Sequence, residues 1–315
     1  MRQTSLTRLY EAHRDSLSLV HVSGPLDARL SVAEERIWPA DLVGHLNLIH
    51  PTRLQVLGAA ELAWAQRQAN EKVAHHLNEI LSAHPPAIIV ADGCEIPNIL
   101  HGICEAHDVA LFTARHPSAS VIDQLRLYLS RELAEKVSLH GVFMDVLGLG
   151  VMITGDSGAG KSELGLELIS RGHGLVADDV VELSRIAPTV LEGRCPEMLQ
   201  DFIEVRGLGL INIRTIFGET ACRRKMRLRL ICHLDRRQPG PDDPCRLPLQ
   251  QETQDILGVK VARVVLPVAA GRNLAVLLEA AVRSTILKLR GIDSTQEFID
   301  RQARALHTDE TRRAD

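Results

Sequence analysis

The feature that most constrains the fold of this chain is a glycine-rich octapeptide near its middle. It reads Gly155-Asp156-Ser157-Gly158-Ala159-Gly160-Lys161-Ser162 and matches the phosphate-binding pattern G-x-x-x-x-G-K-[ST] at every fixed position. An apolar stretch at 150–154 has the character of a strand, and the residues at 163–169 favour a helix. Glycines let successive backbone N–H groups curve around phosphate oxygens, and a helix N-terminus adds partial positive charge. The motif therefore predicts a strand–loop–helix unit within an α/β fold.

The side chains at the end of this loop indicate the ligand. Lys161 would neutralise the β- and γ-phosphates of a nucleotide, and the hydroxyl of Ser162 would ligate Mg²⁺. The alternative is a glycine-rich turn that binds nothing. Because a strand and a helix both stand where the motif needs them, we predict that residues 155–162 bind ATP.

Apolar patterns divide the chain into two α/β regions. In the first, strands are expected at 53–58, 87–91 and 109–112, and helices at 59–81, 97–107 and 121–136. In the second, two strands joined by a tight turn are expected at 142–154, more strands at 174–177, 228–234 and 262–268, and a helix at 274–289. We predict an α/β protein with an N-terminal α/β domain over 1–133, whose sequence contains no motif for chemistry. A C-terminal P-loop domain over 134–315 is expected to have a mixed sheet flanked by helices.

Three further positions are candidates for chemistry. Asp178 and Asp179 follow a short strand, and ligands of open α/β sheets bind at that end of the strands. One carboxylate would organise Mg²⁺ and the other would accept a proton from an attacking hydroxyl, although adjacent acids often only cap an element. Glu204 would complete a metal site or form a surface ion pair. His140 is one of fourteen histidines, and its position alone does not distinguish it.

Charge and composition exclude several classes of protein. Acidic residues number 40 and basic residues 36, so the chain lacks the basic excess of a nucleic-acid-binding protein. The basic stretch at 223–229 alternates with apolar residues, which favours the solvent face of a strand. The six cysteines form no Cys-x-x-Cys pair, and free thiols are expected. Because no secretory signal and no apolar run of membrane-spanning length is present, we expect a cytoplasmic protein with no membrane partner.

Taken together, the motifs resemble those of the HPr kinase/phosphorylase family, bacterial enzymes that phosphorylate a serine of the phosphocarrier protein HPr. The resemblance runs over the C-terminal half, through these segments: 140–142, 148–150, 155–163, 171–179, 204–209 and 267–275. The segment Glu204-Val205-Arg206-Gly207-Leu208-Gly209 is the most specific of these, since ordinary P-loop kinases lack it. The N-terminal half is similar to the family more loosely.

The resemblance implies both an activity and roles for residues. The family transfers a phosphoryl group from ATP, or from pyrophosphate in some members, to the HPr serine, and inorganic phosphate reverses the step to give pyrophosphate. By position, Asp179 is the base, Lys161 holds phosphates, Ser162 and Glu204 hold Mg²⁺, and His140 lies in the active centre. Arg246 falls at a catalytic arginine, the segment 267–272 matches the one tied to dephosphorylation, and the implied assembly is a homohexamer through the C-terminal domains.

The sequence departs from the family at two positions. Ala269 stands where the family often has Lys or Arg, which removes a positive charge near the segment tied to dephosphorylation, and Cys245 stands where the family often has Asp.

The residues themselves leave two other functions open. A different P-loop kinase for small molecules, or an ATPase, would turn over ATP without a protein acceptor. A regulatory protein that only senses ATP would bind it without producing a labelled product.

Overall fold

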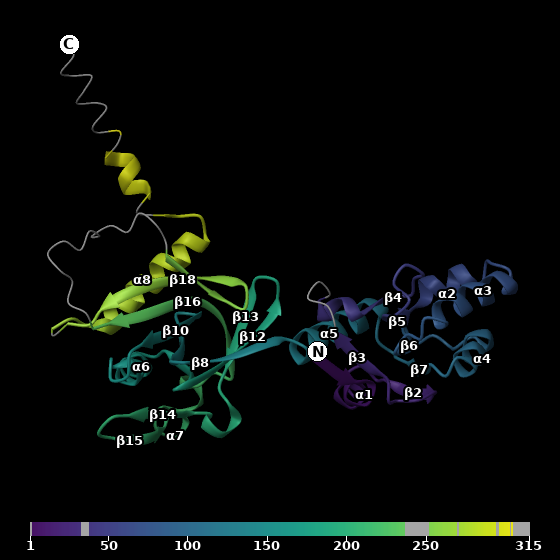
Figure 1. Ribbon diagram of the computed structural model, residues 1–315, viewed down its shortest axis with the longest axis horizontal. Helices are drawn as coiled ribbons and strands as arrows, with labels where there is room; N and C mark the ends of the chain where they lie inside the picture. Colours follow the sequence, from purple (N-terminus) through teal and green to yellow (C-terminus); the bar gives the residue numbers. More distant parts are fainter. Residues whose placement is uncertain are drawn as a thin grey trace, which may run out of the picture. The chain divides into compact units, whose positions relative to one another are not determined.

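The computed structural model describes residues 2–32, 38–236, 252–269, 271–293, 296–302 and 304. Its contacts divide the chain into two compact units, Met1–Ala134 and Glu135–Asp315 (Figure 1). Each unit has its own sheet and its own buried apolar clusters, as expected of domains that are stabilised separately.

The described part of the N-terminal unit contains a five-stranded sheet with the order β2-β7-β6-β5-β4. Its parallel strands are β4 (Val43–His45), β5 (Leu54–Leu57), β6 (Ala87–Val90) and β7 (Ala110–Thr113), and β2 (Val20–Ser23) pairs antiparallel with β7. A separate antiparallel pair joins β1 (Arg2–Ser5) to β3 (Arg29–Val32). All residues of β5 and β6 are buried, which is typical of parallel strands covered on both faces.

Helices cover the two faces of this sheet. They are α1 (Leu6–His13), α2 (Ala59–Ala65), α3 (Asn70–Leu81), α4 (Asn98–Ala106) and α5 (Ser118–Glu132), with a 3-10 turn at Pro39–Leu42. Alternate strand residues contribute to different clusters: Val56 and Ile89 pack with residues of α1 and α5, while Leu57 and Ile88 pack with residues of α3 and α4. The period of two along each strand therefore gives one buried cluster per face.

In its described residues, the C-terminal unit is organised around a mixed sheet of nine strands. They are β8 (Glu135–His140), β9 (Val142–Val146), β10 (Leu149–Gly155), β11 (Gly174–Ala177), β12 (Val180–Ala187), β13 (Val190–Arg194), β16 (Lys225–Asp235), β17 (Glu252–Ile256) and β18 (Val259–Pro267). Strand β16 pairs in parallel with β10 and β18, and antiparallel with β13 through its first residues. The remaining pairings are antiparallel.

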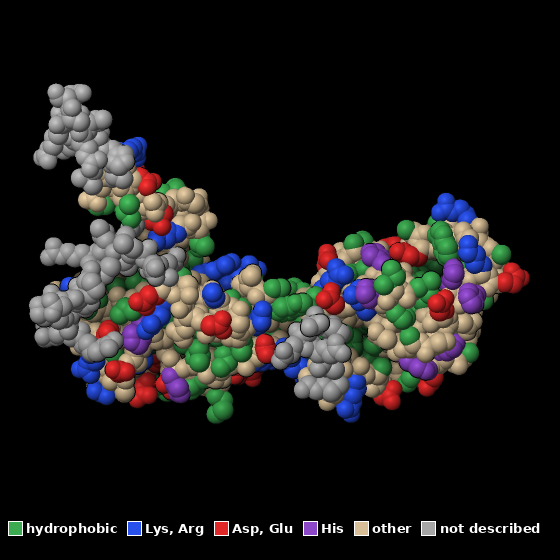
Figure 2. Space-filling view, turned by 45° about the horizontal axis from the view of Figure 1, so that its top comes forward, with side chains coloured by type: hydrophobic (Ala, Val, Ile, Leu, Met, Phe, Trp, Pro, Cys, Tyr) green, Lys and Arg blue, Asp and Glu red, His purple; other side chains and the backbone are tan. Residues whose placement is uncertain are grey.

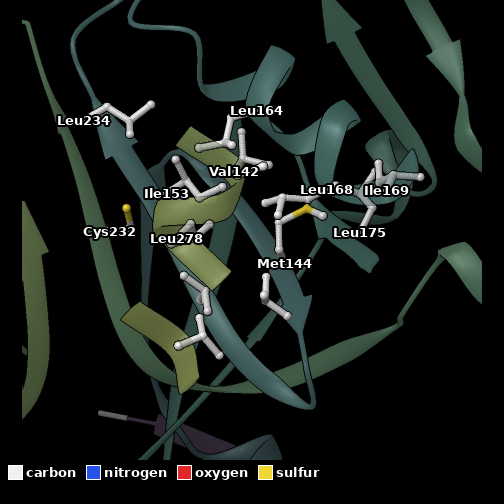
Figure 3. Packing of buried hydrophobic residues seen from close by; sticks show 14 of the residues in the cluster. Val142, Met144, Ile153, Leu164, Leu168, Ile169, Leu175, Cys232, Leu234 and Leu278 are labelled. Carbon is white, nitrogen blue, oxygen red and sulfur yellow. The ribbon is translucent and has the colours of Figure 1, made fainter. Parts of the chain in front are cut away.

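The two faces of this sheet pack differently. On one face, β9 and β10 contact α6 (Lys161–Ser170) and α8 (Leu274–Leu289), and Figure 3 shows Val142, Met144 and Ile153 gathered with Leu164, Leu168 and Leu278. On the other, Phe143 and Met152 pack in a cluster supplied by the strands themselves. Both clusters are fully apolar, so burial of strand side chains on both faces fixes the position of β10.

A small hairpin lies beside α6. It consists of β14 (Phe202–Val205) and β15 (Gly209–Asn212), followed by α7 (Ile213–Phe217), with 3-10 turns at Glu197–Leu199 and Glu219–Ala221. Ile203 is completely buried in the cluster that includes α6. This hairpin therefore carries the predicted Glu204 close to the helix that follows the glycine-rich loop.

The predicted mixed α/β architecture is confirmed, and two of the predicted helices differ from the structure. The helix expected at 59–81 is two helices, with a turn after Ala65 and an extended residue, Ala69, before α3. The helix expected at 121–136 ends at Glu132, and the chain from Glu135 forms β8, because residues 135–140 pair with 180–185 of β12. The basic stretch at 223–229 is confirmed as a strand face from Lys225 onward, where Lys225, Arg227 and Arg229 are exposed. Arg223 precedes the strand and pairs with Asp145.

Other sequence expectations concern the surface and the thiols. Within the described ranges, no helix is both long enough and apolar enough to cross a bilayer. Figure 2 shows Lys and Arg side chains interspersed with Asp and Glu over the visible face. Five described cysteines are free, and burial raises the pKa of Cys104 and Cys232 to about 12. These two thiols are therefore protonated and unreactive at neutral pH.

Candidate phosphate-binding site

The glycine-rich loop joins β10 to α6, as the motif predicts. Three of its glycines have positive φ: Gly155 (148°), Gly158 (74°) and Gly160 (89°). A Cβ atom at Gly155 would lie 2.7 Å from the carbonyl oxygen of Leu234 on β16. The loop thus needs glycine both for its left-handed backbone and for its close approach to the neighbouring parallel strand.

The ammonium group of Lys161 lies against the loop itself. Lys161 Nζ donates hydrogen bonds to the carbonyl oxygens of Gly155 and Asp156, both at 3.0 Å. This holds a positive charge at the first turn of α6, where the helix N-terminus also favours an anion. The backbone therefore positions the lysine that the sequence predicted to hold phosphates.

Asp178 connects the loop to the hairpin. Its Oδ1 accepts a hydrogen bond from the hydroxyl of Ser162 at 3.0 Å, and its Oδ2 accepts one from the backbone N–H of Glu204 at 2.8 Å. Burial raises the pKa of the Asp178 carboxyl above its ordinary value, and these hydrogen bonds offset only part of the rise. Ser162, Asp178 and Glu204, which are far apart in the sequence, are thus brought together; the side chain of Glu204 is exposed.

His140 and Asp179 form a pair at the adjacent strand ends. His140 Nδ1 lies 3.5 Å from Asp179 Oδ1, and their side chains are 82% and 73% exposed. The N–H of Gly141 donates to the carbonyl oxygen of Asp179, and Asp179 has a φ of 64°. A positive φ is uncommon for a residue with a side chain. The backbone between buried Asp178 and β12 therefore turns the Asp179 carboxylate out towards solvent, next to the histidine.

Two arginines approach the loop at Gly158. A Cβ atom built on Gly158 would lie 3.6 Å from Arg206 Nη1 and 3.7 Å from Arg236 Nη1. Arg206 follows β14, and Arg236 follows the last residue of β16. Neither arginine was selected from the sequence as a site residue.

The remaining predicted positions lie near the end of β18 or outside the described residues. The N–H of Val268 donates to the carbonyl oxygen of Asp235 at 2.7 Å, which puts the segment that begins at 267 beside the end of β16. Ala269 is exposed there. Arg246 and Cys245 lie outside the described residues.

Comparison with known protein families gives two matches that together span nearly the whole chain. The model described as "HPr Serine kinase C-terminal domain" matches residues 131–302, and the one described as "HPr Serine kinase N terminus" matches residues 5–129. The chain belongs to the HPr kinase/phosphorylase family. The "HPr kinase/phosphorylase" of Azoarcus sp. (strain BH72) is 82% identical over 309 residues, covering 98% of this chain and 99% of that protein.

Further relatives of the HPr kinase/phosphorylase family are also similar. The protein of that name from Aromatoleum aromaticum is 77% identical over 306 residues, covering 97% of this chain and 98% of its own. A solved structure described as the Hpr(Ser) kinase/phosphatase from Coxiella burnetii is 37% identical, covers 51% of this chain and 98% of its own, and has a TM-score of 0.45. As a member of a kinase family, this chain is an enzyme that uses a nucleotide or phosphate substrate.

The residues of this site differ in how clearly the sequence marks them. The loop has a motif, and Asp178 and Asp179 had a positional signal at a strand end. Arg206 was visible only as part of a segment, and Arg236 had no signal at all. Its place depends on the parallel pairing of β16 with β10, which no short pattern encodes.

Proposed function

We propose that this chain transfers a phosphoryl group from ATP, or from pyrophosphate, to a serine of HPr. It also removes that group with inorganic phosphate, giving pyrophosphate. The hydrogen bond from Ser162 to Asp178 carries the proposal, because it joins the phosphate-binding loop directly to the pair of acids. A donor site for phosphate and a candidate proton acceptor are thereby adjacent in one unit.

In the forward direction, Asp179 is the proposed base. As the serine oxygen bonds to the terminal phosphorus, its proton passes to the Asp179 carboxylate, and the bond from phosphorus to the leaving phosphate oxygen breaks. In the reverse direction, an oxygen of inorganic phosphate bonds to phosphorus, and protonated Asp179 returns the proton to the departing serine oxygen. His140, 3.5 Å away, orients the carboxylate or the reacting phosphate.

The phosphoryl groups require positive charge more than strong base catalysis, since the transition state is loose. Lys161 and the N–H groups of residues 155–162 would hold the donor phosphates. Arg246 stays a prediction from the resemblance. Phosphorylase activity is proposed for the same site, because microscopic reversibility uses each group in both directions.

The residues of the loop fit a magnesium ion. Mg²⁺ prefers oxygen ligands and is usually held by one or two carboxylates together with substrate phosphates. Ser162 supplies a hydroxyl next to the buried carboxylate of Asp178, and Glu204 is tied to that carboxylate through its N–H. In the described part of the chain, no group of three or more His, Cys, Asp or Glu forms a metal cluster. When bound, Mg²⁺ would neutralise charge on the phosphates, with Ser162 and Glu204 as its proposed protein ligands.

HPr is the proposed protein substrate, and a homohexamer assembled through the C-terminal unit is the proposed state. Apolar side chains on the hairpin and α7 are exposed, which suits contact with other proteins. They include Leu208 (67% exposed), Leu210 (65%) and Ile216 (63%).

The first test replaces Asp179 with Asn and measures transfer from labelled ATP to purified HPr. We expect the rate to fall by about 10²- to 10⁴-fold because the base is lost, while ATP binding persists. Asp123→Asn, at an exposed position of α5, is the matched control and should leave the rate unchanged.

Three results would contradict the proposal. Full-rate transfer by Asp179→Asn would remove the base assignment. Undiminished ATP turnover without HPr would favour a small-molecule kinase or an ATPase. Tight ATP binding with no labelled product would favour a sensor.

A further inference from the structure

The tip of the phosphate-binding loop is approached by two guanidinium groups from separate segments. Arg206 Nη1 and Arg236 Nη1 would lie 3.6 and 3.7 Å from the same point, a Cβ atom on Gly158. Gly158 itself has a φ of 74°, inside the loop predicted to hold phosphates. Both arginines are exposed, so an incoming ligand can reach them.

Within the ranges that the structure describes, neither of these two guanidinium groups is hydrogen-bonded or ion-paired to a carboxylate. Lys161 adds a third cation to the same loop, and among the described residues it donates hydrogen bonds to the loop carbonyls of Gly155 and Asp156. Like charges gathered at one place repel each other unless an anion lies between them. The cluster is therefore electrostatically complementary to a small polyanion.

The backbone next to Arg236 is fixed by the sheet. Strand β16 lies between β10 and β18 in parallel pairing, and the carbonyl oxygen of Asp235 accepts the N–H of Val268. Parallel strands of an open sheet bind ligands at their carboxyl ends. Arg236 is the first residue beyond that end of β16, so its side chain starts from an anchored position next to the loop.

We propose that Arg236 binds the phosphate next to the transferred phosphoryl group, an inference that rests on the function proposed above. In the forward direction its ligand is the β-phosphate of ATP or the leaving phosphate of pyrophosphate, and in the reverse direction it is inorganic phosphate, the attacking group. A guanidinium group forms two parallel hydrogen bonds to phosphate oxygens, which an ammonium group cannot do. Inorganic phosphate has no nucleotide to anchor it, so the reverse reaction depends more on Arg236.

The test compares Arg236→Ala and Arg236→Lys with Arg229→Ala, which removes an exposed arginine from the same strand. For Arg236→Ala, we expect the KM for inorganic phosphate, with phosphoserine-HPr as substrate, to rise at least about tenfold, the cost of one charge-assisted contact. The KM for ATP should rise less. Arg236→Lys should have a KM for inorganic phosphate between those of Arg236→Ala and the unaltered protein. Arg229→Ala should match the unaltered protein.

A relocated charge provides a second arm. Ala269 follows Val268, whose N–H is bonded to the residue before Arg236, so Ala269→Arg offers a guanidinium close to the lost one. In the Arg236→Ala background, this substitution should recover part of the affinity for inorganic phosphate. No recovery, together with an unchanged KM in the single variant, would reject the proposal.

Direct binding separates this inference from the function. Calorimetric titration with pyrophosphate and Mg²⁺ should show Arg236→Ala weakened about tenfold relative to Arg229→Ala, with circular dichroism showing that both are folded. If the unaltered protein failed to phosphorylate HPr but Arg236→Ala still lost pyrophosphate affinity, the proposed function would fail and the anion site would stand. Equal pyrophosphate affinities in the two variants would overturn the anion site alone.

Discussion

Two glycines of the phosphate-binding loop share a left-handed backbone but have different surroundings. Gly155 faces the carbonyl oxygen of Leu234, which a Cβ atom would approach to 2.7 Å. Gly160, with a φ of 89°, has no heavy atom within 4 Å of such a Cβ. The cost of a side chain should therefore differ between them, since only one position adds a steric clash to backbone strain.

The prediction at the residue scale compares Gly155→Ala with Gly160→Ala. Gly160→Ala should lower the free energy of unfolding by about 1 kcal/mol, the cost of a positive φ for a residue with Cβ. Gly155→Ala should lower it by about 3 kcal/mol, because the strand must also shift. Urea denaturation without nucleotide measures both. Equal losses would show that the contact with β16 does not constrain the loop.

Individual site residues were predictable to different degrees. The loop and Lys161 could be predicted because phosphate binding requires a local pattern. Asp178 could be noticed but not distinguished from Asp179, since only the fold buries one carboxylate at Ser162 and exposes the other beside His140. Arg236 could not be predicted, because its approach to Gly158 depends on strand order.

At the scale of elements, one buried carboxylate links α6 to α8. Glu279 on α8 accepts two hydrogen bonds from Arg171, at 2.7 and 2.9 Å, and lies 3.0 Å from His173 Nε2. These partners lower the pKa of Glu279 to about 2. Arg171 and His173 flank the turn between α6 and β11, so the cluster fixes the helix of the phosphate-binding loop against the C-terminal helix.

The prediction for this cluster concerns acid stability. A lowered folded-state pKa contributes stability above the unfolded value, here 4.5, and that contribution is lost as the pH falls towards about 2. Glu279→Gln should therefore lower the free energy of unfolding by about 2 kcal/mol at neutral pH. The difference from the unaltered protein should shrink below about pH 4.5.

The control for this prediction is an exposed ion pair. Glu297 pairs with Arg301 one turn along a helix. Its replacement by Gln should lower the free energy of unfolding by at most about 0.5 kcal/mol. If the loss in free energy of unfolding caused by Glu279→Gln did not depend on pH, the interaction between α6 and α8 would not be ionic.

The elements themselves were mostly predictable where their signals are local. The hairpin of β9 and β10 is dense in apolar residues and has Gly148 in its turn, and it was predicted. The helix that was expected to reach residue 136 was overextended, because β8 is stabilised by backbone pairing with β12, forty to fifty residues away in the sequence. Local propensity carries no information about such distant strand partners.

At the scale of the molecule, the two units contain separate buried clusters. The C-terminal unit, Glu135–Asp315, contains the loop, both acids, His140 and Glu204 within its own contacts. Its clusters draw only on residues from that unit. The sequence predicted two α/β regions. It could not predict the order of the nine described strands, because only the assembled fold brings β16 next to the three strands with which it pairs.

The prediction at this scale is that a fragment of residues 135–315 folds and assembles without the N-terminal unit. We expect a cooperative thermal transition, ATP binding, and the sedimentation of a homohexamer. A folded but monomeric fragment would place assembly contacts in the N-terminal unit. An unfolded fragment would show that the two units depend on each other for stability.

The backbone at Asp179 has a consequence for how this enzyme can change over time. A residue with a side chain at a φ of 64° is held in a conformation that glycine adopts freely. Glycine there would relax the main chain while deleting the proposed base. Selection for thermal stability alone would thus favour glycine at this position, at the expense of activity. Only selection for phosphoryl transfer would retain the aspartate.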